Sequence, residues 1–116
     1  FFTKPPKVEE IMSKTVMVMG TGAQGGTIAM RLNDEANVEK IIALAQDSDH
    51  LFIEAAFLHA QQDLAVEKHH LTARQAGELA ARCAARQFTI FHFSPRYIGQ
   101  EDLLYREANE AYVLNQ

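Results

Sequence analysis

Two polar residues stand at the ends of short apolar runs, where loops commonly present reactive side chains. His92 follows the run 88–91 and comes directly before a Ser-Pro turn, and Glu54 closes the run 50–54. Histidine binds metal ions and moves protons near neutral pH, so His92 is a candidate for either role. Apolar residues also follow Glu54, and a carboxylate in such surroundings is costly unless a metal, a hydrogen bond or a proton stabilises it. Glu54 is therefore a second candidate site residue.

His70 is a third candidate, because it stands two residues before the predicted start of a helix. Thr72 and Gln75 have the spacing of a capping box. One face of the helix would then bury Ala76, Leu79, Ala80 and Cys83. Cys83 is accordingly interpreted as a small core residue and not as a nucleophile. Each candidate also has a plainer interpretation: a polar plug for His92, a surface carboxylate at a fraying strand for Glu54, and a solvated histidine for His70.

The elements that must position these residues follow the order β-α-α-β-α-β-α. Short apolar runs predict strands at 15–19, 50–54 and 87–91. Helices are predicted at 26–32, through Val38, Ile41, Ile42 and Ala45, at 72–83 and from 101 onward, and residues 61–68 can form one or two further helical turns. This order favours an α/β fold with a mainly parallel sheet flanked by helices. In such sheets the reactive crevice lies at the carboxyl ends of the strands, where Glu54 and His92 are expected.

The composition of the chain indicates a globular protein with one domain. The 116 residues are 47% hydrophobic and 22% charged, which fits a single α/β domain over 12–116, preceded by a surface arm or processing remnant at 1–11. A net charge of -4 argues against broad binding to a phosphate backbone. The single cysteine favours a reducing, cytoplasmic setting, and no apolar run approaches membrane-spanning length.

A glycine-rich segment suggests a second kind of site. Gly20, Gly22 and Gly25 match G-x-G-x-x-G directly after the first predicted strand. Residues 12–42 resemble the start of Rossmann domains in the saccharopine dehydrogenase-like family, which implies NAD(P) binding by these glycines. That alternative requires a strand at 38–43. The plainer interpretation of the glycines is a close-packed strand-to-helix turn.

A larger resemblance covers about residues 34–113. Its motifs are Glu-Ala-Ala-Phe at 54–57, His-Leu-Thr-Ala-Arg-Gln-Ala at 70–76, and His-Phe-Ser-Pro-Arg-Tyr at 92–97. In order and spacing they resemble the C-terminal part of ribonuclease Z and its relatives, so the resemblance implies the C-terminal half of a metallo-β-lactamase fold.

The same resemblance assigns roles to individual residues. It implies that His92 is a zinc ligand, that Glu54 and His70 form a proton-handling pair, and that a metal-bridging aspartate falls at Asp34. The chain departs from the family pattern at Ile53 and Ala56, where the family has histidine and threonine.

The chain lacks one motif that the resemblance requires. Its 116 residues contain no His-x-His-x-Asp-His cluster, which supplies most of the family's zinc ligands. A closed zinc shell needs about four ligands. The leading hypothesis is therefore a ribonuclease Z-like segment at 34–116, following the glycine-rich segment at 12–33, that is inactive alone toward RNA or another phosphodiester. A missing N-terminal half or a homo-oligomer would complete it. The alternatives are an NAD(P)-binding module and a non-catalytic oligomerising domain.

Overall fold

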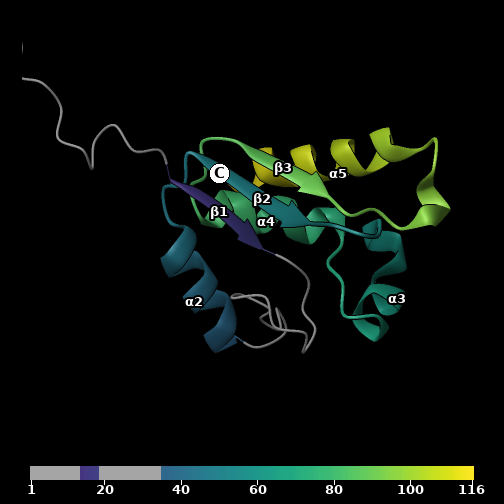
Figure 1. Ribbon diagram of the computed structural model, residues 1–116, viewed down its shortest axis with the longest axis horizontal. Coiled ribbons are helices and arrows are strands. Elements are labelled where there is room, and N and C mark those ends of the chain that lie inside the picture. The colour runs from purple at the N-terminus through teal and green to yellow at the C-terminus, as the bar shows by residue number, and fades with distance from the viewer. Residues whose placement is uncertain (1–13, 19–34) are drawn as a thin grey trace, which may run out of the picture.

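The computed structural model describes residues 14–18 and 35–116, and its sheet has three parallel strands (Figure 1). The strands are β1 (Thr15–Val18), β2 (His50–Glu54) and β3 (Phe88–Phe91). β2 lies in the middle and pairs with both neighbours. Each apolar run that predicted a strand contains one of these strands. The predicted parallel sheet is confirmed.

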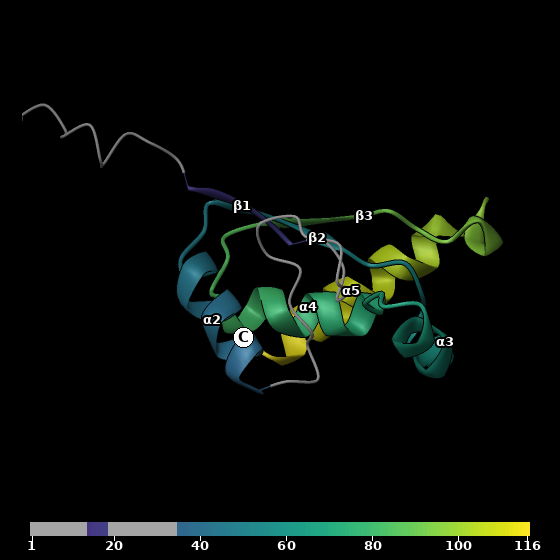
Figure 2. The same cartoon turned by 60° about the horizontal axis from the view of Figure 1, so that its bottom comes forward.

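Helices flank the sheet as predicted. They are α2 (Glu35–Ala45), α3 (Gln62–Glu67), α4 (Ala73–Arg82) and α5 (Glu101–Leu114), with short 3-10 helices η1 (His59–Gln61) and η2 (Pro95–Tyr97). Figure 2 shows α2, α4 and α5 below one face of the sheet, and α3 beyond the carboxyl ends of the strands. None of the helices in the described ranges has both the length and the apolar character needed to cross a bilayer.

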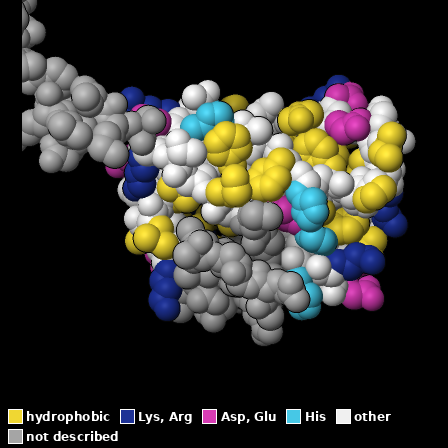
Figure 3. Space-filling view, viewed as in Figure 1, with side chains coloured by type: hydrophobic (Ala, Val, Ile, Leu, Met, Phe, Trp, Pro, Cys, Tyr) yellow, Lys and Arg dark blue, Asp and Glu magenta, His cyan; other side chains and the backbone are white. Residues whose placement is uncertain are grey.

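The core lies between the sheet and this helix layer. Strand residues alternate between the two faces of a sheet, and Leu51, Ile53 and Ile90 are buried in one cluster with Leu79 of α4 and Leu104 of α5. On the opposite face, hydrophobic and histidine side chains gather over the strands (Figure 3). The apolar runs that predicted the strands thus supply the sheet side of this core.

α2 decides between two expectations for residues 38–43. The segment is helical from Glu35 to Ala45, and it buries Val38, Ile41 and Ala45 at helical spacing. The strand that the dinucleotide-binding alternative requires is therefore absent from this segment. A single helical face can bury these residues, whereas the adjacent pair Ile41 and Ile42 would point to opposite faces of a strand.

Several predicted residues lie outside the described part of the chain. They are the metal-bridging candidate Asp34, the glycines Gly20, Gly22 and Gly25, the helix at 26–32 and the arm at 1–11. NAD(P) binding by the glycines stays a prediction. Asp49, which lies just before β2, accepts a hydrogen bond from the Lys14 backbone N–H at 2.7 Å and pairs with Arg86 at 3.5 Å.

Cys83 is fully buried at the end of α4, as its position on the helix face predicted. Burial raises the pKa of its thiol from 9.0 to about 11, and the nearby charges of Arg82 and Lys14 offset only part of that rise. The folded protein therefore holds the thiol proton more tightly than the unfolded chain does. The stability this contributes is fully present below pH 9.0 and is lost as the pH rises to about 11.

We expect iodoacetamide to alkylate Cys83 slowly at pH 8 in the folded protein and quickly in denaturant, because the thiolate is the nucleophile. Mass spectrometry of timed samples measures both rates. Equal alkylation rates in the folded and denatured protein would contradict the burial of the Cys83 thiol.

Candidate active site

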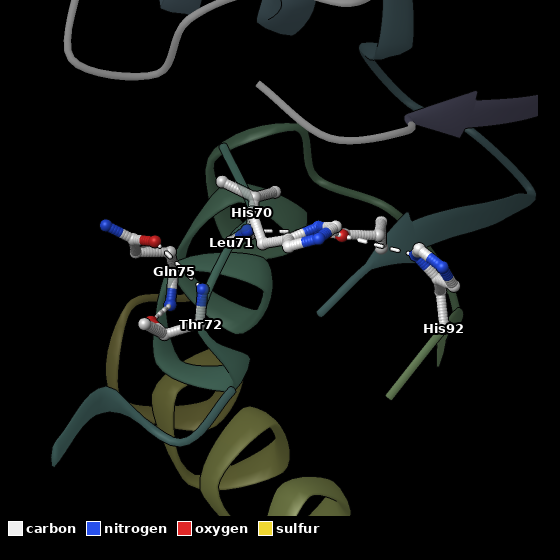
Figure 4. Close-up of polar contacts among 6 residues, drawn as sticks. His70, Leu71, Thr72, Gln75 and His92 are labelled. Carbon is white, nitrogen blue, oxygen red and sulfur yellow. Dashed lines mark hydrogen bonds and ion pairs between the residues drawn. The ribbon is translucent and has the colours of Figure 1, made fainter. Parts of the chain in front are cut away.

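The three candidate residues come together at the carboxyl ends of two strands and the start of α4. Glu54 is the last residue of β2 and is in register with Phe91, the last residue of β3. His92 follows Phe91 directly, so the parallel pairing brings it beside Glu54. His70 lies two residues before Thr72, the N-cap of α4. Figure 4 shows His70, before the start of α4, and His92, after the end of β3, pointing toward each other.

Glu54 is the centre of the arrangement. Its carboxylate is almost fully buried, with a relative exposure of 1%. Oε1 contacts Nδ1 of His70 and lies 3.4 Å from Nδ1 of His92, and Oε2 accepts the backbone N–H of Leu71 at 3.1 Å. Three donors thus compensate the carboxylate for its lost solvation, which is the condition a buried carboxylate must meet. The surface interpretation of Glu54 is wrong.

The pairing also fixes which nitrogen of each histidine is free. Both rings turn Nδ1 toward the same carboxylate oxygen, and their centroids are 5.4 Å apart. An acceptor at Nδ1 favours the tautomer with its proton there, which leaves the lone pair on Nε2. A carboxylate that orients histidine in this way is typical of metal ligands and of proton carriers. The Nε2 atoms of His70 and His92 are therefore the groups available for chemistry.

The site borders an open cleft of about 280 Å³. Besides the two histidines, its lining includes Lys68, Arg96, Phe57 and Phe93. The guanidinium carbon of Arg96 lies 5.8 Å from the centre of the Phe57 ring, within reach of a cation–π contact. Two cations beside two histidines suit an anionic ligand, although the chain as a whole carries a net charge of -4.

His92 has a left-handed backbone conformation that residues other than glycine rarely adopt. Its φ is 66°, and His69 beside His70 has a φ of 61°. The left-handed region costs a residue with a Cβ about 1–2 kcal/mol relative to the right-handed one. Such conformations concentrate at functional sites, where the surrounding structure holds them.

We expect His92→Gly to be about 1 kcal/mol more stable than His92→Ala, because only glycine adopts this φ without cost. Urea unfolding of both variants measures the difference. At His50, the first residue of β2, the same two substitutions should give the reverse order. Equal stabilities of the two variants at His92 would show that the backbone there is unstrained.

Sequence reasoning found the three side chains but missed the backbone donor. Among the described residues, Glu54, His70 and His92 form a group whose possible ligand atoms all lie within 4.8 Å of one another. The N–H of Leu71 completes the carboxylate's partners. A backbone donor leaves no residue-type signal in a sequence, so only the structure could reveal it.

Comparison with known proteins gives a consistent result. The chain is 39% identical over 77 residues to ribonuclease Z of Thermobifida fusca, a match covering 66% of this chain and 24% of that protein. It is 38% identical over 81 residues to ribonuclease Z of Exiguobacterium sibiricum, covering 70% of this chain and 27% of that protein. The match to ribonuclease Z of Streptomyces coelicolor is 44% identical over 64 residues, covering 55% and 21%.

The chain spans about a quarter of the length of the curated relatives it matches. No family model matches it. The predicted resemblance to ribonuclease Z is confirmed, whereas none of these matches concerns a Rossmann domain. The chain thus contains a segment similar to ribonuclease Z.

Proposed function

We propose that this chain supplies two zinc ligands, His92 and Asp34, and a proton-transfer pair, Glu54 and His70, to a metal-dependent phosphodiesterase of the ribonuclease Z type. The observation that carries the proposal is the buried carboxylate of Glu54, which contacts Nδ1 of both His70 and His92. The relatives' name supports RNA as the substrate.

His92 fits the role of a metal ligand. Its side chain is 59% exposed and its Nδ1 faces a carboxylate, so Nε2 can reach an ion in the cleft. Two bound metal ions would clamp the attacking and leaving oxygens of a phosphodiester and lower the pKa of a bound water. Asp34 is the second ligand we propose. These two residues fall short of the ligands that a two-metal centre needs, and the sequence contains no His-x-His-x-Asp-His cluster.

His70 fits the role of the general acid. Its side chain is only 28% exposed and contacts Glu54 on the Nδ1 side, so the imidazolium form, protonated on both ring nitrogens, can deliver its Nε2 proton to the departing alkoxide and become neutral imidazole. Glu54 then stabilises the ring in both protonation states, as an acceptor for Nδ1–H. Lys68 and Arg96 on the cleft lining would attract the phosphodiester.

The experiment has two parts, both performed with the oligomeric state known from sedimentation. We expect calorimetric titration of the monomer with zinc to show no tight stoichiometric binding, and the monomer not to hydrolyse bis(p-nitrophenyl) phosphate. Adding a polypeptide that carries His-x-His-x-Asp-His should produce hydrolysis, and His92→Ala should prevent it. Tight zinc binding by the isolated monomer would contradict the claim that its metal site is incomplete. If the His92→Ala variant still hydrolyses the substrate after the polypeptide is added, His92 is not a metal ligand.

A further inference from the structure

Glu107 of α5 joins three segments near the candidate site. Its Oε2 accepts the backbone N–H of His59 at 2.9 Å and that of Arg74 at 3.1 Å. His59 begins η1, and Arg74 is the second residue of α4. These partners lie 48 and 33 residues away in the sequence. One carboxylate therefore fixes the starts of two helices against a third.

The segment that carries His70 depends on this contact. The first N–H groups of a helix have no partner within the helix. Along 70–76 every backbone N–H donates to an acceptor in the structure: Ala65 O, Glu54 Oε2, Gln75 Oε1, Phe57 O, Glu107 Oε2, Thr72 Oγ1 and Thr72 O, in order. Among these acceptors, Glu107 is the one that α5 contributes. Removing it leaves the N–H of Arg74 without its partner, one turn from His70.

A close contact between the two helices brings Glu107 within reach. A Cβ added to Gly77 of α4 would lie 2.1 Å from the carbonyl oxygen of Ala108 on α5. The backbones can approach this closely because Gly77 has no side chain. Ala108 is the next residue after Glu107, and Gly77 lies one turn beyond Arg74. The contact between Gly77 and Ala108 therefore places Glu107 level with the first turn of α4.

The contact of the Glu107 carboxylate with the start of α4 is electrostatically favourable, and a second hydrogen bond supports the same arrangement. A carboxylate at a helix N-terminus interacts favourably with the helix dipole. His59, whose N–H donates to Glu107, also places its Nδ1 3.0 Å from the Oγ1 of Thr72, the N-cap of α4. Thr72 in turn follows Leu71, whose N–H donates to Glu54.

We propose that Glu107 is a positioning residue for the candidate site: by fixing the start of α4, it holds His70 against Glu54. This inference rests on the proposed role of the Glu54–His70 pair. Glu107 is not among the residues that line the cleft beside Glu54, and its hydrogen bonds go to backbone N–H groups and not to the His70 ring. Its effect on chemistry therefore passes through the backbone of 70–74.

The test compares three substitutions of Glu107 in the full chain by NMR. Glu107→Ala removes the carboxylate, Glu107→Asp retracts it by one methylene, and Glu107→Gln keeps an acceptor oxygen at the same reach. We expect amide exchange at Arg74 and His59 to accelerate about tenfold or more in the Ala and Asp variants. The imidazole ¹⁵N signals of His70 should shift in the same two variants, and Glu107→Gln should stay close to the original protein. Glu110→Ala, at an exposed position on the same helix, is the matched control.

All spectra are recorded at a temperature where circular dichroism shows each variant fully folded. A purely structural role would lower the melting temperature and leave the His70 ring signals in place, and that result would overturn the proposal. If Glu107→Ala does not fold, the contrast between the Asp and Gln variants decides the same question. The measurement needs neither zinc nor substrate, so it can succeed or fail independently of the proposed phosphodiesterase function.

Discussion

Glu54→Ala is expected to destabilise the protein by about 2 kcal/mol, because the buried N–H of Leu71 loses its acceptor. The two histidines also lose the carboxylate that they share. In a complex completed by a His-x-His-x-Asp-His polypeptide, hydrolysis of bis(p-nitrophenyl) phosphate should fall about 10²–10⁴-fold, the usual contribution of a positioned general acid. Urea unfolding measures the first effect and steady-state kinetics the second.

Glu54→Gln separates the two effects. The amide keeps an oxygen that can accept the N–H of Leu71, so most of the stability should remain. Its NH₂ group cannot accept Nδ1–H from a histidine, so hydrolysis should still fall strongly. Glu110→Ala, which changes an exposed carboxylate on α5, should leave both quantities unchanged. If Glu54→Gln retains full hydrolysis in the completed complex, the carboxylate has no part in proton transfer.

Local patterns in the sequence predicted the parts of the site that depend on neighbouring residues. The three apolar runs became strands, and the capping box at Thr72 and Gln75 forms with both of its hydrogen bonds. Parallel strands end at one edge of a sheet, so Glu54 and His92 could be expected to meet there. They do, at 3.4 Å.

The remaining features depend on contacts between distant segments. The left-handed backbone of His92 could not be predicted from its residue type, because residues other than glycine adopt that φ only uncommonly. The contacts of Glu107 join residues 33 and 48 positions apart, and nothing in the pattern of α5 distinguishes this glutamate from Glu101 or Glu110. Such pairings become visible only when the packing of α4 against α5 is known.

The glycine-rich segment shows the limit of a motif considered alone. G-x-G-x-x-G requires a second strand after its helix to form a dinucleotide site. In the described structure the segment at 38–43 lies within α2, and β2 begins only at His50. The Rossmann resemblance and the helical spacing of the apolar residues thus make opposite predictions for one short segment, and the spacing gives the correct one.

Gly77→Ala is expected to destabilise the protein by about 2 kcal/mol, although alanine is the better helix former. The new Cβ would lie 2.1 Å from the carbonyl oxygen of Ala108 and 2.9 Å from the Cβ of Ala111, so α4 and α5 must move apart. Overpacking of this kind costs about 1–3 kcal/mol or more, and the gain in helix propensity returns only about 1 kcal/mol. Urea unfolding measures the net loss.

Gly99→Ala is the matched control, because it tests backbone conformation without crowding. Apart from its two chain neighbours, no described residue has an atom within 4 Å of a Cβ added there, but φ is +83°, so we expect a loss of about 1 kcal/mol from the backbone alone. The two variants should also differ at the site. Separating α4 from α5 pulls Glu107 away from the N–H of Arg74, so Gly77→Ala should shift the His70 ring signals and Gly99→Ala should not. If Gly77→Ala stabilises the protein, the helices are not in close contact and Glu107 cannot reach the start of α4.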